Sequence, residues 1–559
     1  MSSRTAPHIR PQHSADLTLA TVADLLGVPI TTSAGGPAAG AAADLVISGV
    51  TLTSSDVRPG DLYVGMPGQH THGAKYAEEA KRLGALAVLT DEAGRAHVAA
   101  GSAKDLPLLI VPEPRLVLGE VAEHIYANDT HRLPTLGVTG TNGKTSTTYF
   151  MEALLSHAGV RTGLSTTVER HVGEHVLGSA LTTPEASELH GLLASMRELG
   201  AKALLVEVSA QAVTRHRIDG VRFAVVGFTN LSPEHLDEYG DMEHYFAAKR
   251  ALFTADRADR AVISLESEWG RRLARETELP VTTVGTDDEC DWQLVDQADR
   301  PDGSTGTLVG PDGQRWPIVL SVPGVHMDVN AVLAVVMLVE SGIIDAQQIE
   351  SGLDAHVLAG VYLPGRLERV SGATGPTFFV DYAHTEDALE RTLVAVRKQT
   401  KGRIVLILGA DGGRDPYKRP AMGRVASELS DVLVVNDINP RFEDPDAIRS
   451  VLVDAARAVD HPAEVYDVGD PSAAIRTAIR LADDDDTIIV CGPGDEDYHE
   501  VRGVKLPYSS RGAAREALRE AGFEPNHSRR GGQDPADGVR LGDLAAAESD
   551  DAETMKEQA

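Results

Sequence analysis

The chain has 559 residues, of which 42% are apolar and 24% are charged, and its formal net charge is −31. A chain of this length is too long for one hydrophobic core and predicts about three or four domains. The acidic balance argues against binding nucleic acid, which needs a basic face. No stretch approaches the roughly 18 uninterrupted apolar residues of a membrane span. Met1 to Leu17 contain no apolar signal core, and two cysteines give no disulfide framework, so we expect a cytoplasmic protein.

The two ends of the chain differ in composition from the rest. Residues 1–15 and the acidic stretch 525–559 contain few large apolar side chains, and we expect both to be disordered. Between them, residues 16–132 predict a small α/β domain. Its short apolar runs are separated by Gly/Pro turns and lie at 44–50, 61–64, 85–90 and 107–111.

A glycine-rich segment at 137–146 is the most informative feature of the sequence. The apolar run Leu133 to Val138 leads into a turn containing Gly137, Gly140 and Gly143, followed by a helix-forming stretch. Such a turn points backbone N–H groups at an anion, and a lysine adds a mobile charge. The spacing is a variant of GxxxxGK[ST], and it predicts a phosphate-binding loop for ATP. Its residues are Gly140, Thr141, Asn142, Gly143, Lys144, Thr145 and Ser146, with Thr145 placed to ligate Mg²⁺.

The rest of the chain alternates strand-like and helix-like segments, which predicts parallel sheets covered on both faces. We expect a central ATPase domain at 133–363 and a Rossmann-like domain without a phosphate loop at 364–524. The central strands are expected at 203–208, 223–229 and 261–265, with helices at 145–157 and 242–253. The later strands are expected at 377–380, 403–408, 432–436 and 487–491, with helices at 386–399 and 419–429.

Two metal-competent side chains follow strands in the central block. Glu207 ends one strand-like run, and His235 follows the next. A carboxylate and an imidazole at one sheet edge could hold Mg²⁺ near phosphates. On spacing alone, His235 is better explained as a hydrogen-bonding loop residue, and Lys249, on the helix after it, as a surface charge.

Six segments in one order resemble the Mur ligase family. They are GTNGKT at 140–145, TTPE at 182–185, TNLSPEHLD at 229–237, YFAAKRALF at 245–253, PGRLER at 364–369 and VDYAHT at 380–385. The resemblance covers about residues 45–525 and is strongest to the members that add the third residue of the peptidoglycan stem peptide. It implies three α/β domains that bind a UDP-sugar, ATP and an amino acid in turn.

The resemblance also implies site residues. Ser54, Thr182, Thr183, Ser209, Arg215 and Arg217 would contact the UDP-muramoyl substrate. Glu207, His235 and a carbamylated Lys249, formed with CO₂, would ligate Mg²⁺, because a carbamate attracts the ion that a free ammonium would repel. Asn330 would face adenine, and Arg366 and Asp381 the ATP ribose and phosphates.

The implied reaction joins an amino acid to UDP-MurNAc-L-Ala-D-Glu through an acyl phosphate. Lys144 and Mg²⁺ would offset the repulsion between phosphate and carboxylate, so Lys144, His235 and Lys249 are the expected catalytic residues. The sequence shows no protein nucleophile, and none is required. We expect a monomer.

The Rossmann-like domain expected at 364–524 narrows the identity of the added amino acid. Family members that use meso-diaminopimelate carry Asp-Asn-Pro-Arg, whereas this chain has Ile438 before Asn439-Pro440-Arg441. The resemblance places Arg414, Asn439, Arg441, Gly492 and Glu496 around the amino acid. Glu496 suggests a cationic distal amine, so an L-diamino acid is expected, with meso-diaminopimelate, L-lysine, L-ornithine and diaminobutyrate left open.

Two other interpretations fit less of the sequence. One is another ligase of the same family, such as the D-Ala-D-Ala-adding or the folate polyglutamylating enzyme. The Asn-Pro-Arg segment and Gly492-Pro-Gly-Asp-Glu496 argue against both. The other is a catalytically silent nucleotide-binding relative, which the joint presence of Lys144, Glu207, His235 and Lys249 disfavours.

Overall fold

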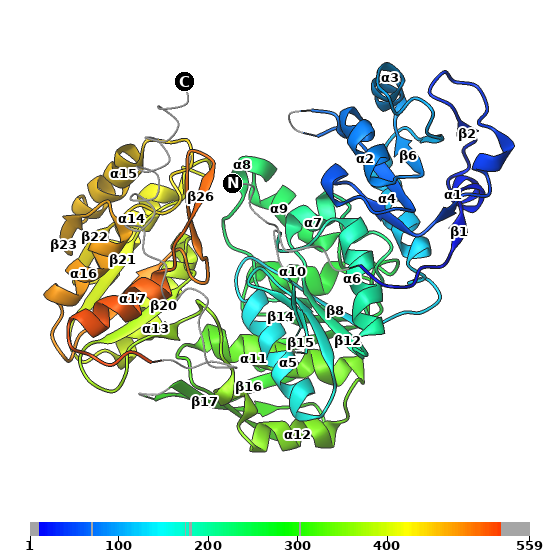
Figure 1. The fold of residues 1–559 in the computed structure, drawn as a ribbon. Coiled ribbons are helices and arrows are strands. Elements are labelled where there is room, and N and C mark those ends of the chain that lie inside the picture. The colour runs from blue at the N-terminus through cyan, green and yellow to red at the C-terminus, as the bar shows by residue number, and fades with distance from the viewer. Residues whose placement is uncertain (1–9, 69–70, 174, 178–180, 301–302, 527–559) are drawn as a thin grey trace, which may run out of the picture.

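The computed structural model describes residues 10–68, 71–173, 175–177, 181–300 and 303–526. They form three α/β domains, with the central domain between the other two (Figure 1), which confirms the predicted fold class. The predicted disorder of residues 1–9 and 527–559 concerns segments outside the described residues. No helix in the described ranges is long and apolar enough to cross a membrane.

The N-terminal domain is built on a five-stranded sheet of order β2-β7-β6-β5-β4. Strands β4 to β7 are parallel, and β2 pairs antiparallel with β7 at one edge. Helices α1 and α4 cover one face, and α2 and α3 cover the other. The elements are β1 (Leu17–Thr18), α1 (Leu19–Leu26), β2 (Ile30–Thr31), η1 (Gly40–Ala42), β3 (Val46–Ile47), β4 (Gly49–Thr51), η2 (Ser54–Asp56), β5 (Asp61–Gly65), η3 (Gly73–Tyr76), α2 (Ala77–Leu83), β6 (Ala87–Thr90), α3 (Glu92–Ala100), β7 (Leu108–Ile110) and α4 (Pro114–Ile125).

Residues at both predicted disordered ends are attached to the fold, contrary to expectation. Arg10 donates both to the Asp61 carboxylate and to the Asp56 carbonyl. The N–H groups of residues 12 and 13 bind the Glu198 carboxylate, and the N–H of Asn526 donates to the Val370 carbonyl at 2.7 Å. These contacts are polar. The expectation of disorder was drawn from the small number of large apolar side chains, which does not reveal such contacts.

The central domain contains an eleven-stranded sheet of order β11-β10-β9-β12-β8-β13-β14-β15-β16-β17-β18. The strands from β9 to β16 are parallel, and both ends are antiparallel. Helices α5 and α11 pack on one face, and α6, α7, α9 and α10 pack on the other. The first elements are β8 (Thr135–Thr139), α5 (Lys144–His157), β9 (Thr162–Ser165), β10 (Arg170–Val172), β11 (His175–Leu177), α6 (Ala186–Glu198), β12 (Ala203–Glu207), α7 (Ala210–Thr214), β13 (Val225–Phe228), α8 (Leu236–Tyr239) and α9 (Met242–Arg250).

The second half of the central domain ends in an antiparallel extension, β16 to β18, that no sequence pattern above predicted. This extension contacts the C-terminal domain, where Lys398 forms an ion pair with Asp299 at 2.9 Å. The elements are β14 (Ala261–Ser264), α10 (Glu268–Glu276), β15 (Val281–Gly285), β16 (Trp292–Arg300), β17 (Gly303–Val309), β18 (Arg315–Leu320), α11 (Val325–Ser341), α12 (Ala346–Asp354) and η4 (Val357–Gly360).

The C-terminal domain has a six-stranded sheet of order β19-β20-β24-β21-β22-β23, parallel except for β19. Helices α13 to α15 cover one face, and α16 and α17 cover the other. The elements are β19 (Glu368–Arg369), β20 (Thr377–Asp381), α13 (Glu386–Gln399), β21 (Ile404–Leu408), α14 (Lys418–Leu429), β22 (Val432–Val435), α15 (Pro445–Arg457), β23 (Glu464–Asp467), α16 (Pro471–Leu481), β24 (Thr487–Cys491), β25 (Tyr498–Val501), β26 (Val504–Pro507) and α17 (Ser510–Glu520).

Candidate active site

The predicted phosphate loop joins strand β8 to helix α5. Gly140 and Gly143 form the turn with φ of +149° and +91°, a conformation that favours glycine. Gly137 was expected in the turn but lies within β8, where Phe223 packs on it. Gly143 is the N-cap of α5 and supplies no capping side chain. The first N–H groups of α5 therefore have no side-chain acceptor at the N-cap, which suits an anion.

Asn330 of α11 lies directly against this turn. A Cβ atom added to Gly143 would meet the Asn330 Oδ1 at 2.3 Å. Asn330 is 5% exposed, and its buried amide packs against the loop at Gly143. Glycine is required at position 143 both for its backbone angle and for this close approach.

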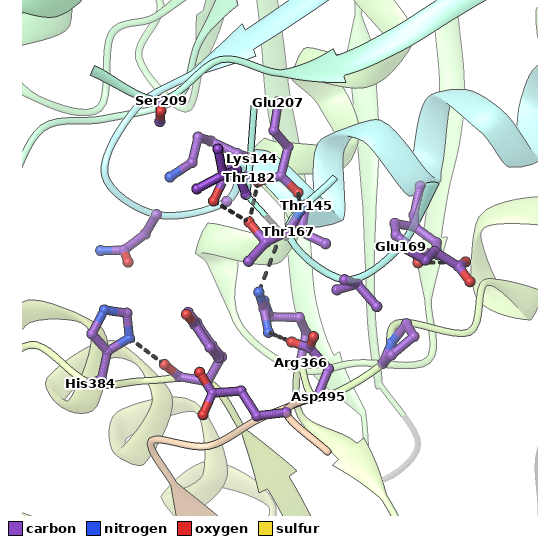
Figure 2. Close-up of a pocket in the computed structure, with 18 of the residues that line it drawn as sticks. Lys144, Thr145, Thr167, Glu169, Thr182, Glu207, Ser209, Arg366, His384 and Asp495 are labelled. Atoms are coloured by element: carbon purple, nitrogen blue, oxygen red, sulfur yellow. Dashed lines mark hydrogen bonds and ion pairs between the residues drawn. The ribbon is translucent and has the colours of Figure 1, made fainter. Parts of the chain in front are cut away.

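Lys144 and Thr145 point into the space between the domains (Figure 2). The Lys144 ammonium donates to the carbonyls of Gly140 and Thr141 at 3.1 and 2.7 Å. Arg366, at the start of the C-terminal domain, donates to the Thr145 hydroxyl at 3.3 Å and pairs with Asp495 at 3.1 Å. Residues from two domains thus meet at the N-terminus of α5.

Glu207 ends strand β12 beside the phosphate loop and is fully buried. Its carboxylate accepts from the Thr167 hydroxyl at 3.0 Å, and the Thr167 oxygen lies 3.2 Å from the Thr182 hydroxyl, within hydrogen-bond distance. The hydroxyl of Thr183 donates to the backbone carbonyl of Glu207 at 2.7 Å. Thr182 and Thr183, two predicted substrate residues, are therefore linked by hydrogen bonds to a predicted metal ligand. Figure 2 shows Thr167, Thr182 and Glu207 together.

His235 precedes helix α8 with a φ of +56°, which projects its side chain into the cleft. Burial lowers the pKa of His235, and the neutral imidazole that results is the form that binds a metal ion. The adjacent Glu234 accepts from the Nε2 of His384, a residue of the C-terminal domain, at 3.0 Å. Burial opposes ionisation of Glu234, but the His384 hydrogen bond and the nearby positive charge of Lys144 help to outweigh it, and the pKa of Glu234 is lowered well below the usual range.

Lys249 on helix α9 is 1% exposed, which excludes the surface-charge interpretation. Its ammonium donates to the Gly140 carbonyl at 2.8 Å and lies 4.7 Å from the centre of the Tyr245 ring. Burial, and then the nearby Lys144, lower the pKa of Lys249 well below that of an ordinary lysine. An amine in this environment is neutral for part of the time, and a neutral amine can add CO₂.

The donor groups near the phosphate loop would suit Mg²⁺ best if Lys249 carried a carbamate. Among the described residues, no group of three or more His, Cys, Asp and Glu side chains is placed to hold a metal ion. Glu207, His235 and the Thr145 hydroxyl supply one carboxylate, one imidazole and one hydroxyl. A carbamate on Lys249 would supply the second carboxylate that a hard divalent ion favours.

One cleft of roughly 2370 Å³ runs from the phosphate loop to the C-terminal domain. It collects most of the predicted site residues, namely Thr141, Asn142, Gly143, Lys144, Thr145, Thr182, Glu207, Ser209, Arg215, Arg217, His235, Arg366, Arg414, Arg441, Gly492 and Glu496. The others are outside its lining, namely Ser54, Gly140, Ser146, Thr183, Lys249, Asn330, Asp381 and Asn439.

Several of the residues outside the lining organise those within it. Asp381 accepts from the N–H groups of Leu367 and Ala383 at 2.7 and 2.8 Å, so it holds the segment that carries Arg366. Asn439 donates to Glu496 at 2.8 Å. Ser54 belongs to the N-terminal domain, where its hydroxyl donates to Glu79.

The two predicted arginines of the nucleotide-sugar side are paired with acids. Arg215 binds Glu238 at 2.7 Å, and Arg217 binds Glu185 at 2.9 Å. Ser209 caps helix α7 by accepting from the Ala212 N–H at 3.1 Å. This wall of the cleft therefore has its cations held in fixed positions.

Some cleft residues were quoted in the sequence motifs without a role. Glu234, Tyr382 and His384 belong to TNLSPEHLD and VDYAHT, and the Arg366 guanidinium stacks 4.2 Å from the centre of the Tyr382 ring. Thr167 and Lys418 also line the cleft. No spacing in the sequence identifies these residues, because their partners lie in other domains or distant loops.

Comparison with known proteins supports the resemblance seen in the sequence. Three Mur ligase models match: the Mur ligase family catalytic domain at 46–126, the Mur ligase middle domain at 138–338, and the Mur ligase glutamate ligase domain at 365–494. The chain belongs to the Mur ligase family. The predictions of family and of ligase class are confirmed.

The relatives narrow the type of ligase. The chain is similar to the UDP-N-acetylmuramyl-tripeptide synthetase of Leifsonia xyli, with 46% identity over 92% of this chain and 98% of the relative. It is also similar to the UDP-N-acetylmuramoyl-L-alanyl-D-glutamate–2,6-diaminopimelate ligase of Streptomyces coelicolor, with 40% identity over 91% and 98% of the two chains. A solved structure of a ligase with that second name is 25% identical, with a TM-score of 0.59 over 86% of this chain and 96% of the other.

Proposed function

We propose that this chain joins an L-diamino acid to UDP-MurNAc-L-Ala-D-Glu at the expense of ATP, as a step of peptidoglycan synthesis. The observation that carries the proposal is that one cleft is lined both by the phosphate loop and by acidic residues of the C-terminal domain, namely Asp411, Asp495 and Glu496. Chains that are 40% or more identical over nine tenths of this one are tripeptide synthetases and diaminopimelate ligases. This likeness argues against the D-Ala-D-Ala-adding, folate-type and non-catalytic alternatives.

The reaction proceeds in two steps. A carboxylate oxygen of the D-glutamyl residue attacks the γ-phosphorus of ATP, ADP leaves, and an acyl phosphate forms. The α-amine of the diamino acid then attacks the acyl carbon, loses a proton, and inorganic phosphate leaves. Both steps bring anions together, so positioning and charge neutralisation supply most of the acceleration.

The residues of the cleft divide this work. The N-terminus of α5 and Lys144 bind the phosphates and offset their charge. Thr167, Thr182 and Ser209 line the wall next to Glu207, where the muramoyl dipeptide would lie. Arg366 reaches the same point from the C-terminal domain.

Thr145, Glu207, His235 and a carbamylated Lys249 would hold Mg²⁺. When bound there, the ion supplies further neutralisation of phosphate charge. Burial, which lowers the pKa of Lys249, supports the modification, because protonation of the amine blocks the addition of CO₂.

Phosphate release tests the function. Release should require ATP, UDP-MurNAc-L-Ala-D-Glu and a diamino acid together. Release with a tripeptide precursor and D-Ala-D-Ala, or with a folate and glutamate, would instead assign the chain to another branch of the family.

Labelled bicarbonate tests the carbamate separately. Protein equilibrated with ¹³C-bicarbonate should show a carbamate resonance that Lys249→Ala removes and the matched exposed-lysine variant Lys81→Ala keeps. Lys249→Ala should also lose phosphate release and regain part of it with added short carboxylates. A wild-type protein that is fully active without the resonance would overturn the carbamate.

A further inference from the structure

Helix α4, the last element of the N-terminal domain, packs on helix α6 of the central domain. Apolar side chains join the two helices in one buried cluster: Leu118, Val121, Ala122 and Ile125 from α4, and Ala186 and Ala194 from α6. Near its N-terminal end, α4 also reaches the segment 215–219, which we call the arginine turn. This turn brings Arg215 and Arg217 to the wall of the cleft.

Two residues of α4 hold the arginine turn in place. The Arg115 guanidinium donates to the carbonyl of Arg215 at 3.1 Å. One helical turn further on, a Cβ atom added to Gly119 would meet the Asp219 carbonyl oxygen at 2.2 Å, so the two backbones are in close contact. Residues four apart lie on the same face of a helix, so both contacts come from one surface of α4. That surface supports a strained backbone, because His216 has a φ of +54°.

Arg115 also binds the acid that Arg217 binds. Glu185 stands at the N-cap of α6, but its side chain makes no capping hydrogen bond. Its carboxylate accepts instead from the Arg217 Nε and from the Arg115 Nη1, each at 2.9 Å. The side chains of Arg217 and Glu185 are 10% and 18% exposed, so water screens this contact only in part. Two guanidinium groups on one carboxylate leave one positive charge in excess.

That excess charge is available to a ligand through Arg217. Among the described residues, the Arg217 guanidinium has one hydrogen-bond partner, Glu185, and it uses Nε for this bond. Its two Nη groups are therefore left for an anion in the cleft that Arg217 lines. The neighbouring Arg215 has its charge matched by Glu238 at 2.7 Å. The surplus in this network thus comes from Arg115, which belongs to another domain and is not part of the cleft lining.

We propose that Arg115 is a positioning residue for the UDP-muramoyl substrate. It neutralises Glu185 and supports the arginine turn, so that Arg217 keeps both its charge and its orientation toward an anionic group of the substrate. Without Arg115, Glu185 would cancel the charge of Arg217. The inference rests on the proposed function, and it assigns part of substrate binding to a helix of the N-terminal domain that lies behind the cleft wall.

Steady-state kinetics of phosphate release test the role of Arg115. Arg115→Gln, which removes the charge and keeps most of the side chain, should raise the KM for UDP-MurNAc-L-Ala-D-Glu roughly tenfold or more, as for the loss of a hydrogen bond between charged groups. The kcat and the KM for ATP should stay within about twofold, because the lost interaction concerns binding of one substrate. Arg115→Lys keeps the charge and should regain part of the loss. Arg95→Ala is the matched control, since it removes the same charge from the same domain, where Arg95 pairs with Glu92 on α3.

A double variant separates charge neutralisation from a general structural role. Glu185→Gln removes the carboxylate that both arginines bind, so adding Arg115→Gln to it should raise the KM for UDP-MurNAc-L-Ala-D-Glu by only about threefold or less. The same rise in both backgrounds, an unchanged KM in Arg115→Gln, or an equal rise in the KM for ATP would overturn the inference. A wild-type protein that releases no phosphate with this substrate would instead contradict the proposed function.

Discussion

The hydrogen bond between Glu234 and His384 should couple the central and C-terminal domains during catalysis. The two side chains meet at 3.0 Å across the cleft, and they belong to residues 150 positions apart. The Glu234 side chain is 13% exposed, so its charge is largely shielded from water. A hydrogen bond to a charged carboxylate in such a place contributes about 1.5–3 kcal/mol.

A double-mutant cycle measures that contribution. Glu234→Gln and His384→Ala should each lower kcat/KM roughly 10- to 150-fold, and the double variant should be little worse than the weaker single variant. The coupling energy should therefore be about 1.5–3 kcal/mol. Urea unfolding of each variant shows whether the fold is intact.

A second pair of residues provides the control. Lys398 and Asp299 also join the central and C-terminal domains, at 2.9 Å, but their side chains are 47% and 28% exposed. Exposed pairs contribute about 0–1 kcal/mol, so the same cycle on this pair should be nearly additive. Additive effects at Glu234 and His384, or equal coupling at both pairs, would refute the reasoning.

Three further outcomes follow from buried or strained groups. Gly143→Ala should raise the KM for ATP at least about tenfold, because its φ of +91° and the adjacent amide admit no Cβ, whereas Gly159→Ala, with a φ of +75° and open space, should leave that KM unchanged in the same assay. Hydrogen bonds to two carboxylates outweigh burial and raise the pKa of His171 to about 9, so the stability that it contributes is complete below pH 6.5 and is lost as the pH rises through 9; His171→Gln should flatten this dependence in urea titrations. Glu368→Ala should reduce the free energy of unfolding of the C-terminal domain by about 3–5 kcal/mol in a urea titration, since it removes the buried carboxylate that pairs with the buried Arg515 guanidinium at 2.8 Å.

The sequence predicted the parallel strands and their helices well because these elements are continuous apolar runs. The helix expected at 386–399 has those bounds in the structure, and the strands at 377, 432 and 487 begin where expected. The extension β16–β18 was missed because only one face of each strand is buried. In β18, Trp316, Ile318 and Leu320 alternate with more exposed residues, a pattern that a search for unbroken apolar runs overlooks.

The parts of the site that belong to a local sequence motif were predictable. The phosphate loop is one such motif, and the resemblance placed Glu207 and His235 in the same cleft as the loop. What could not be predicted are contacts between domains, such as Arg366 with Thr145. These contacts depend on how the domains pack together and on which side-chain rotamers the packing allows. The local spacing of residues in the sequence predicts neither.

Positive charge lies at the phosphate-loop end of the cleft, and acidic side chains lie at the other end. This separation explains how a chain with a net charge of −31 binds anionic substrates. At the phosphate loop, the Lys144 ammonium donates to backbone carbonyls, so its charge is not neutralised by a carboxylate. At the far end, Arg441 is shared between two acids and Glu496 lies beside it. A phosphate is therefore attracted to one end and an ammonium to the other. The charges therefore direct the nucleotide and the amino acid to opposite ends of the same cleft, and the carboxylate meets the phosphate near Lys144, which can offset the repulsion between them.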